Sequence, residues 1–129
     1  MAKAHLYTLL HQYLTDADRA LRAQSGYAKL SPAIRLLDTA YTENQSIGEL
    51  ARLCGISETH FRRLFRSLFG KAPAEYRISK RILHAGDLLI SGQYTVSEAA
   101  HATGFSDPSY FCRVFRAHTG MSPLEFMRQ

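Results

Sequence analysis

The stretch "GISETHFRRLFRSLFGKAPAEY", from Gly55 to Tyr76, has a counterpart later in the chain in "GFSDPSYFCRVFRAHTGMSPLEF", from Gly104 to Phe126. The two stretches align at an offset of 49 residues at their first glycine, and at an offset of 50 from their first shared phenylalanine onward. One residue is therefore inserted in the second copy. Identities this dense indicate a duplicated structural unit, and two copies are too few to build a solenoid.

Each copy carries the signals for a short helix that ends in a tight turn. The tetrapeptides "SIGE", from Ser46, and "TVSE", from Thr95, match the S/T-x-x-E capping box. In that motif the hydroxyl and the carboxylate satisfy N–H groups at the start of a helix. Gly55 and Gly104 follow shortly after, and glycine there permits the left-handed conformation that closes a helix. The pattern predicts a short helix and a turn in each copy.

A second helix is expected after each turn, because Ser57 and Asp107 suit its N-cap position. Its apolar residues have the i, i+3, i+4, i+7 spacing of one helix face. They are Phe61, Leu64, Phe65 and Leu68 in the first copy, and Phe111, Val114 and Phe115 in the second. A short helix, a tight turn and a second helix make a helix-turn-helix unit. We expect the second helices at 59–68 and 109–118.

The opposite face of each second helix is polar and carries arginine. Its residues are Thr59, Arg62, Arg63 and Arg66 in the first copy, and Ser109, Cys112, Arg113 and Arg116 in the second. On an isolated helix such a face is most often only a solvated surface. Here it recurs on the helix that enters the major groove in DNA-binding proteins of this kind. Because arginine can bond guanine O6 and N7 together, we interpret Arg63 and Arg113 as contacts to bases or phosphates.

The connection between the copies predicts one long helix from 74 to 91. A helix of this length spans about 27 Å, and major-groove openings on one face of DNA are about 34 Å apart. A rigid connector would therefore let a single chain read two turns of DNA without dimerising. Its basic residues Arg77, Lys80 and Arg81 either contact phosphates or only solvate the helix. Gly86 is the weak point of this helix, since glycine disfavours helix interiors.

The composition allows one ordinary domain and excludes several classes of protein. The chain has 129 residues, a hydrophobic fraction of 46% and a net charge of +5. The segment 60–81 alone holds seven Lys/Arg and one acidic residue, which favours an anionic partner. Neither Cys54 and Cys112 nor the six histidines have metal-ligand spacing, so no metal or other cofactor is expected. No apolar run suits a membrane span, and the N-terminus is a poor signal peptide, so we expect a cytoplasmic protein without a membrane partner.

The segment from Ser46 to Met127 resembles the DNA-binding domain of the AraC/XylS family of bacterial transcription regulators. The resemblance rests on "ELARLCGISETHFRRLFRSLFGKAPAEY", on the connector beginning "RISKRILHA", and on "VSEAAHATGFSDPSYFCRVFRAHTGMSPLEF". It implies an all-α fold of two helix-turn-helix subdomains joined by a long linker helix. It also implies sequence-specific binding to double-stranded promoter DNA, regulation of transcription (usually activation) and contact with RNA polymerase.

The resemblance also implies which residues meet DNA. The base readers fall on Thr59, Arg62 and Arg63 in the first subdomain, and on Ser109, Cys112 and Arg113 in the second. We assign phosphate contacts to Arg66, Arg77, Lys80, Arg81 and Arg116. The family commonly has Ser or Thr at the position of Cys112. A thiol is a weak hydrogen-bond partner, so readout there is apolar or absent, and we favour a packing role for Cys112 over redox sensing.

Four regions are expected along the chain: an N-terminal amphipathic helix and connector at 1–30, a first helix-turn-helix subdomain at 31–72, the linker helix at 73–92 and a second subdomain at 93–129. Ser31 and Pro32 suit the start of the first helix of the first subdomain. The apolar stripe between Leu6 and Leu21 leaves three interpretations open. It is the last element of an effector-sensing domain absent from this chain, a homodimer seam, or a helix that folds back on the core.

The sequence favours a DNA-binding regulator over two other classes. The alternative is a protein-interaction module that uses the helix-turn-helix fold without reading DNA, which predicts weaker positive charge on the outer faces than is found. An enzyme is not expected, because the sequence offers no nucleophile–base pair, paired carboxylates or phosphate-binding glycine loop.

Overall fold

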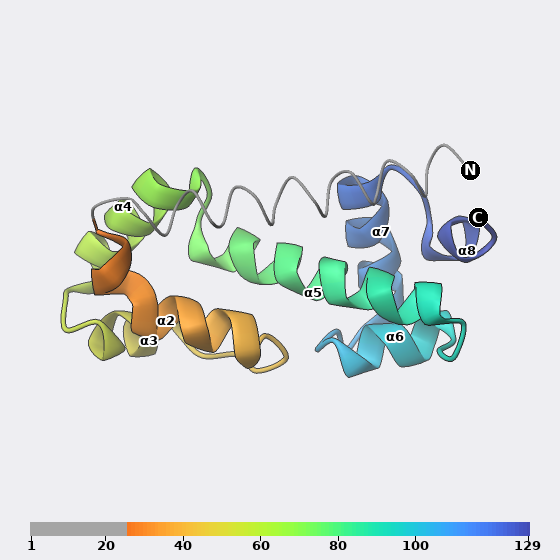
Figure 1. The fold of residues 1–129 in the computed structure, drawn as a ribbon, viewed down its shortest axis with the longest axis horizontal. Helices are drawn as coiled ribbons and strands as arrows, with labels where there is room; N and C mark the ends of the chain where they lie inside the picture. Colours follow the sequence, from red (N-terminus) through yellow and green to blue (C-terminus); the bar gives the residue numbers. More distant parts are fainter. Residues whose placement is uncertain (1–25) are drawn as a thin grey trace.

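The computed structural model describes residues 26–129, and every regular element among them is a helix (Figure 1). The helices are α2 (Tyr27–Thr39), α3 (Ile47–Leu53), α4 (Glu58–Phe69), α5 (Pro73–Ser91), α6 (Val96–Ala102), α7 (Pro108–Thr119) and α8 (Pro123–Met127). The predicted all-α fold class is confirmed. The predictions for the apolar stripe between Leu6 and Leu21 lie outside the described residues.

The linker helix α5 joins two helical units, one toward each of its ends (Figure 1). In the first unit α2, α3 and α4 contact one another, and α2 and α4 also contact α5. In the second unit α7 contacts α6 and α8, and all three pack against α5. The two helix-turn-helix pairs, α3–α4 and α6–α7, are thus carried by one shared helix, as the resemblance implied.

The first unit buries a core that is rich in aromatic rings. Its members are Leu30, Ala33, Ile34, Leu37, Leu50, Ala51, Phe61, Phe65, Leu68 and Tyr76. The ring of Phe65 lies 4.5 Å from that of Phe69 and 5.4 Å from that of Tyr76, between centroids. Because burial of each large apolar side chain contributes about 1.5–3 kcal/mol, this core fixes which face of α4 points inward.

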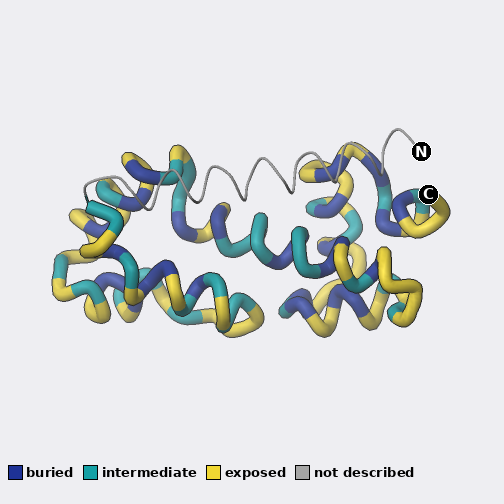
Figure 2. The backbone as a smooth tube through the Cα atoms, in the orientation of Figure 1, coloured by how far each residue is buried: buried dark blue, intermediate teal, exposed yellow. Residues whose placement is uncertain are grey.

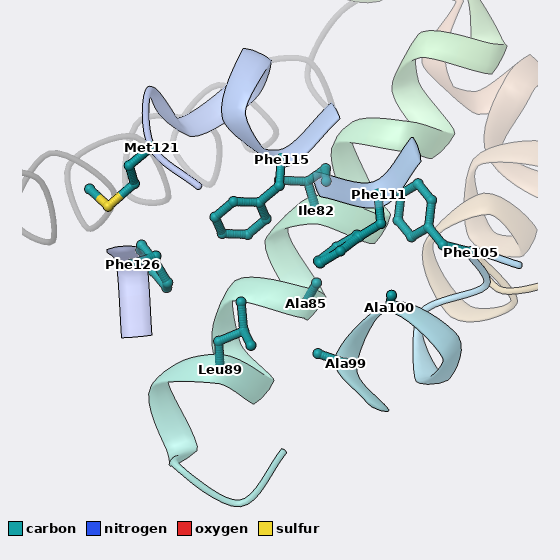
Figure 3. Close-up of a cluster of buried hydrophobic side chains, with 10 residues drawn as sticks. All are labelled: Ile82, Ala85, Leu89, Ala99, Ala100, Phe105, Phe111, Phe115, Met121 and Phe126. Carbon is teal, nitrogen blue, oxygen red and sulfur yellow. The ribbon is translucent and has the colours of Figure 1, made fainter. Parts of the chain in front are cut away.

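The second unit repeats this arrangement around α7 (Figure 3). Phe111 and Phe115 are fully buried and extend from α7 toward Ile82 and Ala85 of α5. Phe126 of α8 closes the cluster, with its ring 5.3 Å from that of Phe115 in an edge-to-face arrangement. The two predicted apolar stripes are therefore equivalent core faces of α4 and α7.

The predicted capping boxes differ between the two copies. The hydroxyl of Thr95 accepts a hydrogen bond from the N–H of Glu98 at 3.1 Å, and the carboxylate of Glu98 accepts one from the N–H of Thr95 at 2.8 Å. At Ser46 the first half of the box forms, with the hydroxyl accepting from the N–H of Glu49 at 3.1 Å. Both α3 and α6 begin where the motif predicts.

The first described helix begins earlier than predicted. We expected Ser31 to cap this helix, but α2 starts at Tyr27 and holds Pro32 inside it. Proline has no N–H to donate to the carbonyl four residues before it, which here is that of Ala28. The hydroxyl of Ser31 donates to this carbonyl at 2.9 Å instead. The expected start at Ser31 is therefore wrong, because its hydroxyl serves the helix interior.

The linker helix runs without interruption through its predicted weak point. It has 19 residues, which corresponds to about 28 Å, and Gly86 lies buried within it. Figure 2 shows that α5 is mostly buried or half-buried along its length, while exposed positions gather on the surrounding helices. Packing against both units stabilises α5 at Gly86, where the low helix propensity of glycine disfavours a helix.

Candidate nucleic-acid interface

Helix α4 presents the polar face that the sequence assigned to it. The hydroxyl of Ser57 caps the helix by accepting from the N–H of His60 at 3.1 Å. Phe61 and Phe65 anchor the inner face. The predicted outer residues Thr59, Arg62, Arg63 and Arg66 are all exposed. Together with Ala72 and Pro73 they line one shallow groove, so the structure brings all four onto a single surface.

One arginine of this surface has a partner that our sequence analysis did not name. Nη2 of Arg62 lies 3.0 Å from Oε1 of Glu58, one helical turn earlier. The i, i+4 spacing could have indicated this pair. Both side chains are about half exposed, and an exposed pair of this kind contributes only about 0.3–0.5 kcal/mol. Arg62 can therefore exchange the carboxylate for another anion at little cost.

Helix α7 presents the corresponding face in the second unit. The carboxylate of Asp107 caps it by accepting from the N–H of Ser109 at 3.0 Å, and Pro108 occupies the first helical position. Of the predicted outer residues, Ser109, Arg113 and Arg116 are exposed. Cys112 is half-buried and packs against the second core. Its position at the edge of the face agrees with the packing role that we favoured.

The second outer face also includes an aromatic residue that our sequence analysis did not assign. Tyr110 is 41% exposed, although its ring lies 6.1 Å from that of the core residue Phe105, between centroids. The guanidinium carbon of Arg113 lies 5.7 Å from the centre of its ring, within the range of a cation–π contact. The i, i+3 spacing of the two residues was the available signal. Tyr110 thus helps to orient the arginine predicted to read a base.

The last residue of the second face is held loosely. Nη1 of Arg116 lies 3.7 Å from Oε1 of Glu125, and the Arg116 side chain is 68% exposed. An ion pair this open contributes little to stability. Arg116 therefore keeps its charge accessible at the C-terminal part of α7, in the position that Arg66 occupies on α4.

The basic residues of the linker helix are placed differently from the prediction, most clearly Arg81. Its side chain is buried, and its guanidinium donates to the carbonyls of Tyr41 at 2.6 Å and Glu43 at 3.2 Å, and to Oδ1 of Asn44 at 2.9 Å. Burial lowers the pKa of this guanidinium, although arginine stays charged. A buried guanidinium with three hydrogen bonds to the loop of its own protein is poorly placed to contact a phosphate. We therefore do not include Arg81 among the phosphate contacts proposed below.

Arg77 and Lys80 are also engaged within the protein. Arg77 donates from Nη2 to the carbonyl of Gln45 at 2.8 Å and to its side-chain oxygen at 3.3 Å. Lys80 lies 3.3 Å from the carboxylate of Asp38 and 5.4 Å from the centre of the Tyr76 ring. Both side chains are partly buried. Sequence reasoning missed Gln45 and Asp38 because they lie more than 30 residues away in the chain.

The predicted arginines of the two outer faces remain accessible. In the view of Figure 1, α4 and α7 lie along the same edge of the described molecule, toward opposite ends of α5. Within residues 26–129 no three metal-binding side chains gather into a site. No helix of that part is long and apolar enough to cross a membrane. Cys54 and Cys112 are both free thiols.

Comparison with known proteins identifies the family. A family model described as a helix-turn-helix domain matches residues 50–129. An AraC-type regulator from Chromobacterium violaceum has the same fold, with a TM-score of 0.73 and 28% identity, over 79% of this chain and 91% of the other. The chain belongs to the AraC family. The family and fold are those of DNA-binding transcription regulators.

Further relatives of this AraC-family chain are longer proteins. An uncharacterised regulator of Escherichia coli K12, YijO, is 38% identical over 127 residues, which is 98% of this chain and 42% of YijO. The virulence activator VirF of Yersinia enterocolitica is 30% identical over 91 residues, which is 70% of this chain and 34% of VirF. The AraC-family chain thus spans less than half the length of these curated relatives.

One solved relative of this AraC-family chain was determined with its ligand. The DNA-binding domain of the global transcriptional factor AdpA, in complex with a target DNA, has a TM-score of 0.71 and 32% identity. The match covers 77% of this chain and 89% of the AdpA domain.

Proposed function

We propose that this chain binds double-stranded DNA in a sequence-specific manner and regulates transcription from the promoters that it recognises. One observation carries the proposal: two equivalent helices, α4 and α7, each bury an aromatic face and expose a face with arginines. In helix-turn-helix proteins this second helix enters the major groove. The AdpA domain that shares this fold was solved on its target DNA.

The exposed residues divide into two proposed roles. Base reading falls to Thr59, Arg62 and Arg63 on α4 and to Ser109 and Arg113 on α7, and the half-buried Cys112 offers only an apolar contact at the edge of that face. Arginine is suited to guanine and the hydroxyls to several bases. Arg66 and Arg116, at the C-terminal parts of the two helices, are proposed to bind phosphates. Such contacts set the register on the duplex without reading its sequence.

We further propose that binding activates transcription through contact with RNA polymerase, in the cytoplasm where bacterial promoters lie. Several relatives are named as transcriptional activators, VirF among them. Effector sensing and dimerisation, which AraC-family members usually place before the DNA-binding part, are proposed to reside outside residues 26–129. We propose no catalytic role for the chain.

The alternative, a protein-interaction module, is less well supported. A partner protein would not need arginines repeated at equivalent positions of two helices. Those exposed arginines match the regular phosphates and base edges of DNA better than an irregular protein surface.

The direct test is selection of bound sequences from a random pool of duplex DNA, followed by affinity measurement across a salt series. We expect one enriched motif and a steep linear fall of log affinity with log salt, because binding releases counterions from the phosphates. A chain with Arg63 and Arg113 both changed to Ala serves as the matched control and should lose the motif. Recovery of no motif, with affinity that does not depend on salt, would contradict the proposal.

A further inference from the structure

The two helix-turn-helix units contact each other beside the middle of α5. Gly104 belongs to the turn between α6 and α7, and Thr42 belongs to the loop between α2 and α3. A Cβ atom placed on Gly104 would lie 3.0 Å from Cα of Thr42 and 3.1 Å from its carbonyl oxygen. The backbone of the second unit therefore packs directly against the backbone of the first.

Arg81 of α5 occupies the centre of this contact. Its guanidinium donates three hydrogen bonds to the loop of the first unit, through the carbonyls of Tyr41 and Glu43 and the side chain of Asn44. The same guanidinium lies 5.9 Å from the centre of the Phe105 ring in the second unit. Its Nε is also 3.1 Å from the Cβ position of Gly104. One side chain thus touches both units and the helix that joins them.

The contact is specific to the second copy of the repeat. Gly55, the counterpart of Gly104 in the first copy, has no atom within 4 Å of its Cβ position. Both glycines adopt positive φ, 70° and 97°, so both suit their turns. Only Gly104 is also confined by another unit. The helix-turn-helix motif explains the positive φ of Gly104. It does not explain why a side chain at this position would collide with the loop of the first unit.

The loop of the first unit is fixed from a second direction. The rings of Tyr41 and His84 stack with centroids 4.0 Å apart and planes 4° apart. His84 follows Arg81 by three residues, so it lies on the same side of α5. The loop is therefore held to α5 at two adjacent points, directly beside the turn of the second unit.

We propose that the junction of Arg81, Gly104 and the loop 41–44 fixes the separation and orientation of α4 and α7, and so sets the spacing of the two DNA sites that one chain binds. This role rests on the proposed function. Arg81 is a positioning residue within it, since its guanidinium bonds the loop of the first unit. Without the junction, only α5 would relate the two units, and each could swivel about an end of that helix.

The first test measures the separation without DNA. Spin labels are placed at Ser67 on α4 and Ala117 on α7, both exposed, after Cys54 and Cys112 are changed to Ala. Electron–electron distance measurement should give one narrow distribution for the parent. Arg81→Met should broaden it and move its mean, while helix content by circular dichroism stays the same. An unchanged distribution in Arg81→Met would overturn the proposal.

The matched control is Arg77→Met, one helical turn earlier on α5. Arg77 also bonds the first-unit loop, through Gln45. Arg77→Met removes these two bonds to the loop and leaves the contacts of Arg81 with both units in place. The junction assigns the spacing to Arg81, so Arg77→Met should keep the narrow distribution. Equal broadening in both variants would mean that general loosening of the loop is responsible, and would also overturn the proposal.

The second test measures spacing preference on the selected DNA motif. Insertion of one base pair between the two half-sites should weaken binding of the parent about tenfold or more, which is the size of one lost base contact. The loss should be smaller for Arg81→Met, with affinity for an isolated half-site unchanged. A loss equal to that of the parent would contradict the proposal.

The two tests separate the two claims. Absence of DNA binding by every form would defeat the proposed function, while the distance measurement would still decide whether Arg81 fixes the units. If Arg81→Met does not fold, Asn44→Ala replaces it, because it removes one acceptor of Arg81 from an exposed side chain. It should broaden the distribution to a lesser degree, and no broadening would count against the junction.

Discussion

At the scale of single residues, the exposed arginines of α4 differ in what surrounds them. Arg62 shares its charge with Glu58, whereas Arg63 lies at the middle of the outer face and Arg66 near the end of the helix. A central position suits a base edge in the groove, and a peripheral one suits the phosphates at its rim. The proposed division of roles follows from these positions.

We predict that Arg63→Ala lowers discrimination in one half of the DNA site by about 1–3 kcal/mol, the usual size of a good base contact. Arg66→Ala should instead weaken binding to all sequences alike and reduce the salt slope by about one. Competition binding with single-base variants of the selected motif, at several salt concentrations, measures both effects. An unchanged motif preference in Arg63→Ala would mean that this residue does not read a base.

The polar site was only partly predictable at this scale. The outer residues of α4 and α7 could be assigned because helical spacing places them opposite an apolar stripe, and local periodicity is visible in sequence. Arg81 could not be placed in this way. Its partners lie in a loop about 40 residues earlier, and neither the charge nor the helical register of α5 reveals that loop.

At the scale of elements, the aromatic anchors of α4 and α7 should be equivalent. Phe65 and Phe115 are both fully buried, so Phe65→Ala and Phe115→Ala should each lower the free energy of unfolding by about 3–5 kcal/mol through cavity formation. Chemical denaturation measures the loss. Stability close to that of the parent in either variant would contradict the assignment of these helices' inner faces.

The two turn glycines should differ in their tolerance of a side chain. Gly55→Ala should lower the free energy of unfolding by about 1–2 kcal/mol, from the left-handed backbone alone. Gly104→Ala should add an overpacking cost of about 1–3 kcal/mol, because its Cβ would meet the backbone of Thr42. Denaturation of the two variants side by side decides this, and equal losses would show that Gly104 has room.

The cap of α6 should make stability depend on pH. Hydrogen bonds from the backbone N–H and the hydroxyl of Thr95 lower the pKa of Glu98 below its usual 4.5. A carboxyl with a lowered pKa in the folded state stabilises the fold above its unfolded pKa, and that contribution is lost as pH falls through the folded pKa. Glu98→Gln should therefore flatten the loss of stability as pH falls below the ordinary glutamate pKa of about 4.5, measured by denaturation at each pH. A curve parallel to that of the parent would refute this role of the cap.

Helix boundaries lie where the sequence predicted them when the signal was a local cap or turn motif. The N-caps at Ser57 and Asp107 and the turn glycines lie where their motifs predicted. The start of α2 did not, because Ser31 resembles an N-cap but its hydroxyl bonds the carbonyl that Pro32 leaves unpaired. A serine followed by a proline occurs both at the start of a helix and inside one. Only the contacts of the preceding residues, here the carbonyl of Ala28, distinguish the two.

At the scale of the whole molecule, the duplicated sequence explains the two equivalent units, and α5 explains how they are joined. The repeat could predict two similar cores and two similar outer faces. It could not predict how the units are oriented, since that depends on Arg81, Gly104 and the loop 41–44, which have no counterpart contact in the first copy. The lack of space at Gly104, which Gly55 does not share, marks a place where the units meet each other.

The central claim is that one chain places α4 and α7 in successive major grooves. Hydroxyl-radical footprinting of a 1:1 complex on the selected DNA, with stoichiometry verified by native mass spectrometry, tests it most directly. The account predicts two protected patches on the same face of the duplex, about one helical turn or 10 base pairs apart. It also predicts that Arg63→Ala weakens protection of one patch and Arg113→Ala that of the other. A single protected patch per chain would contradict the account, if one of these two substitutions abolished its protection and the other left it unchanged.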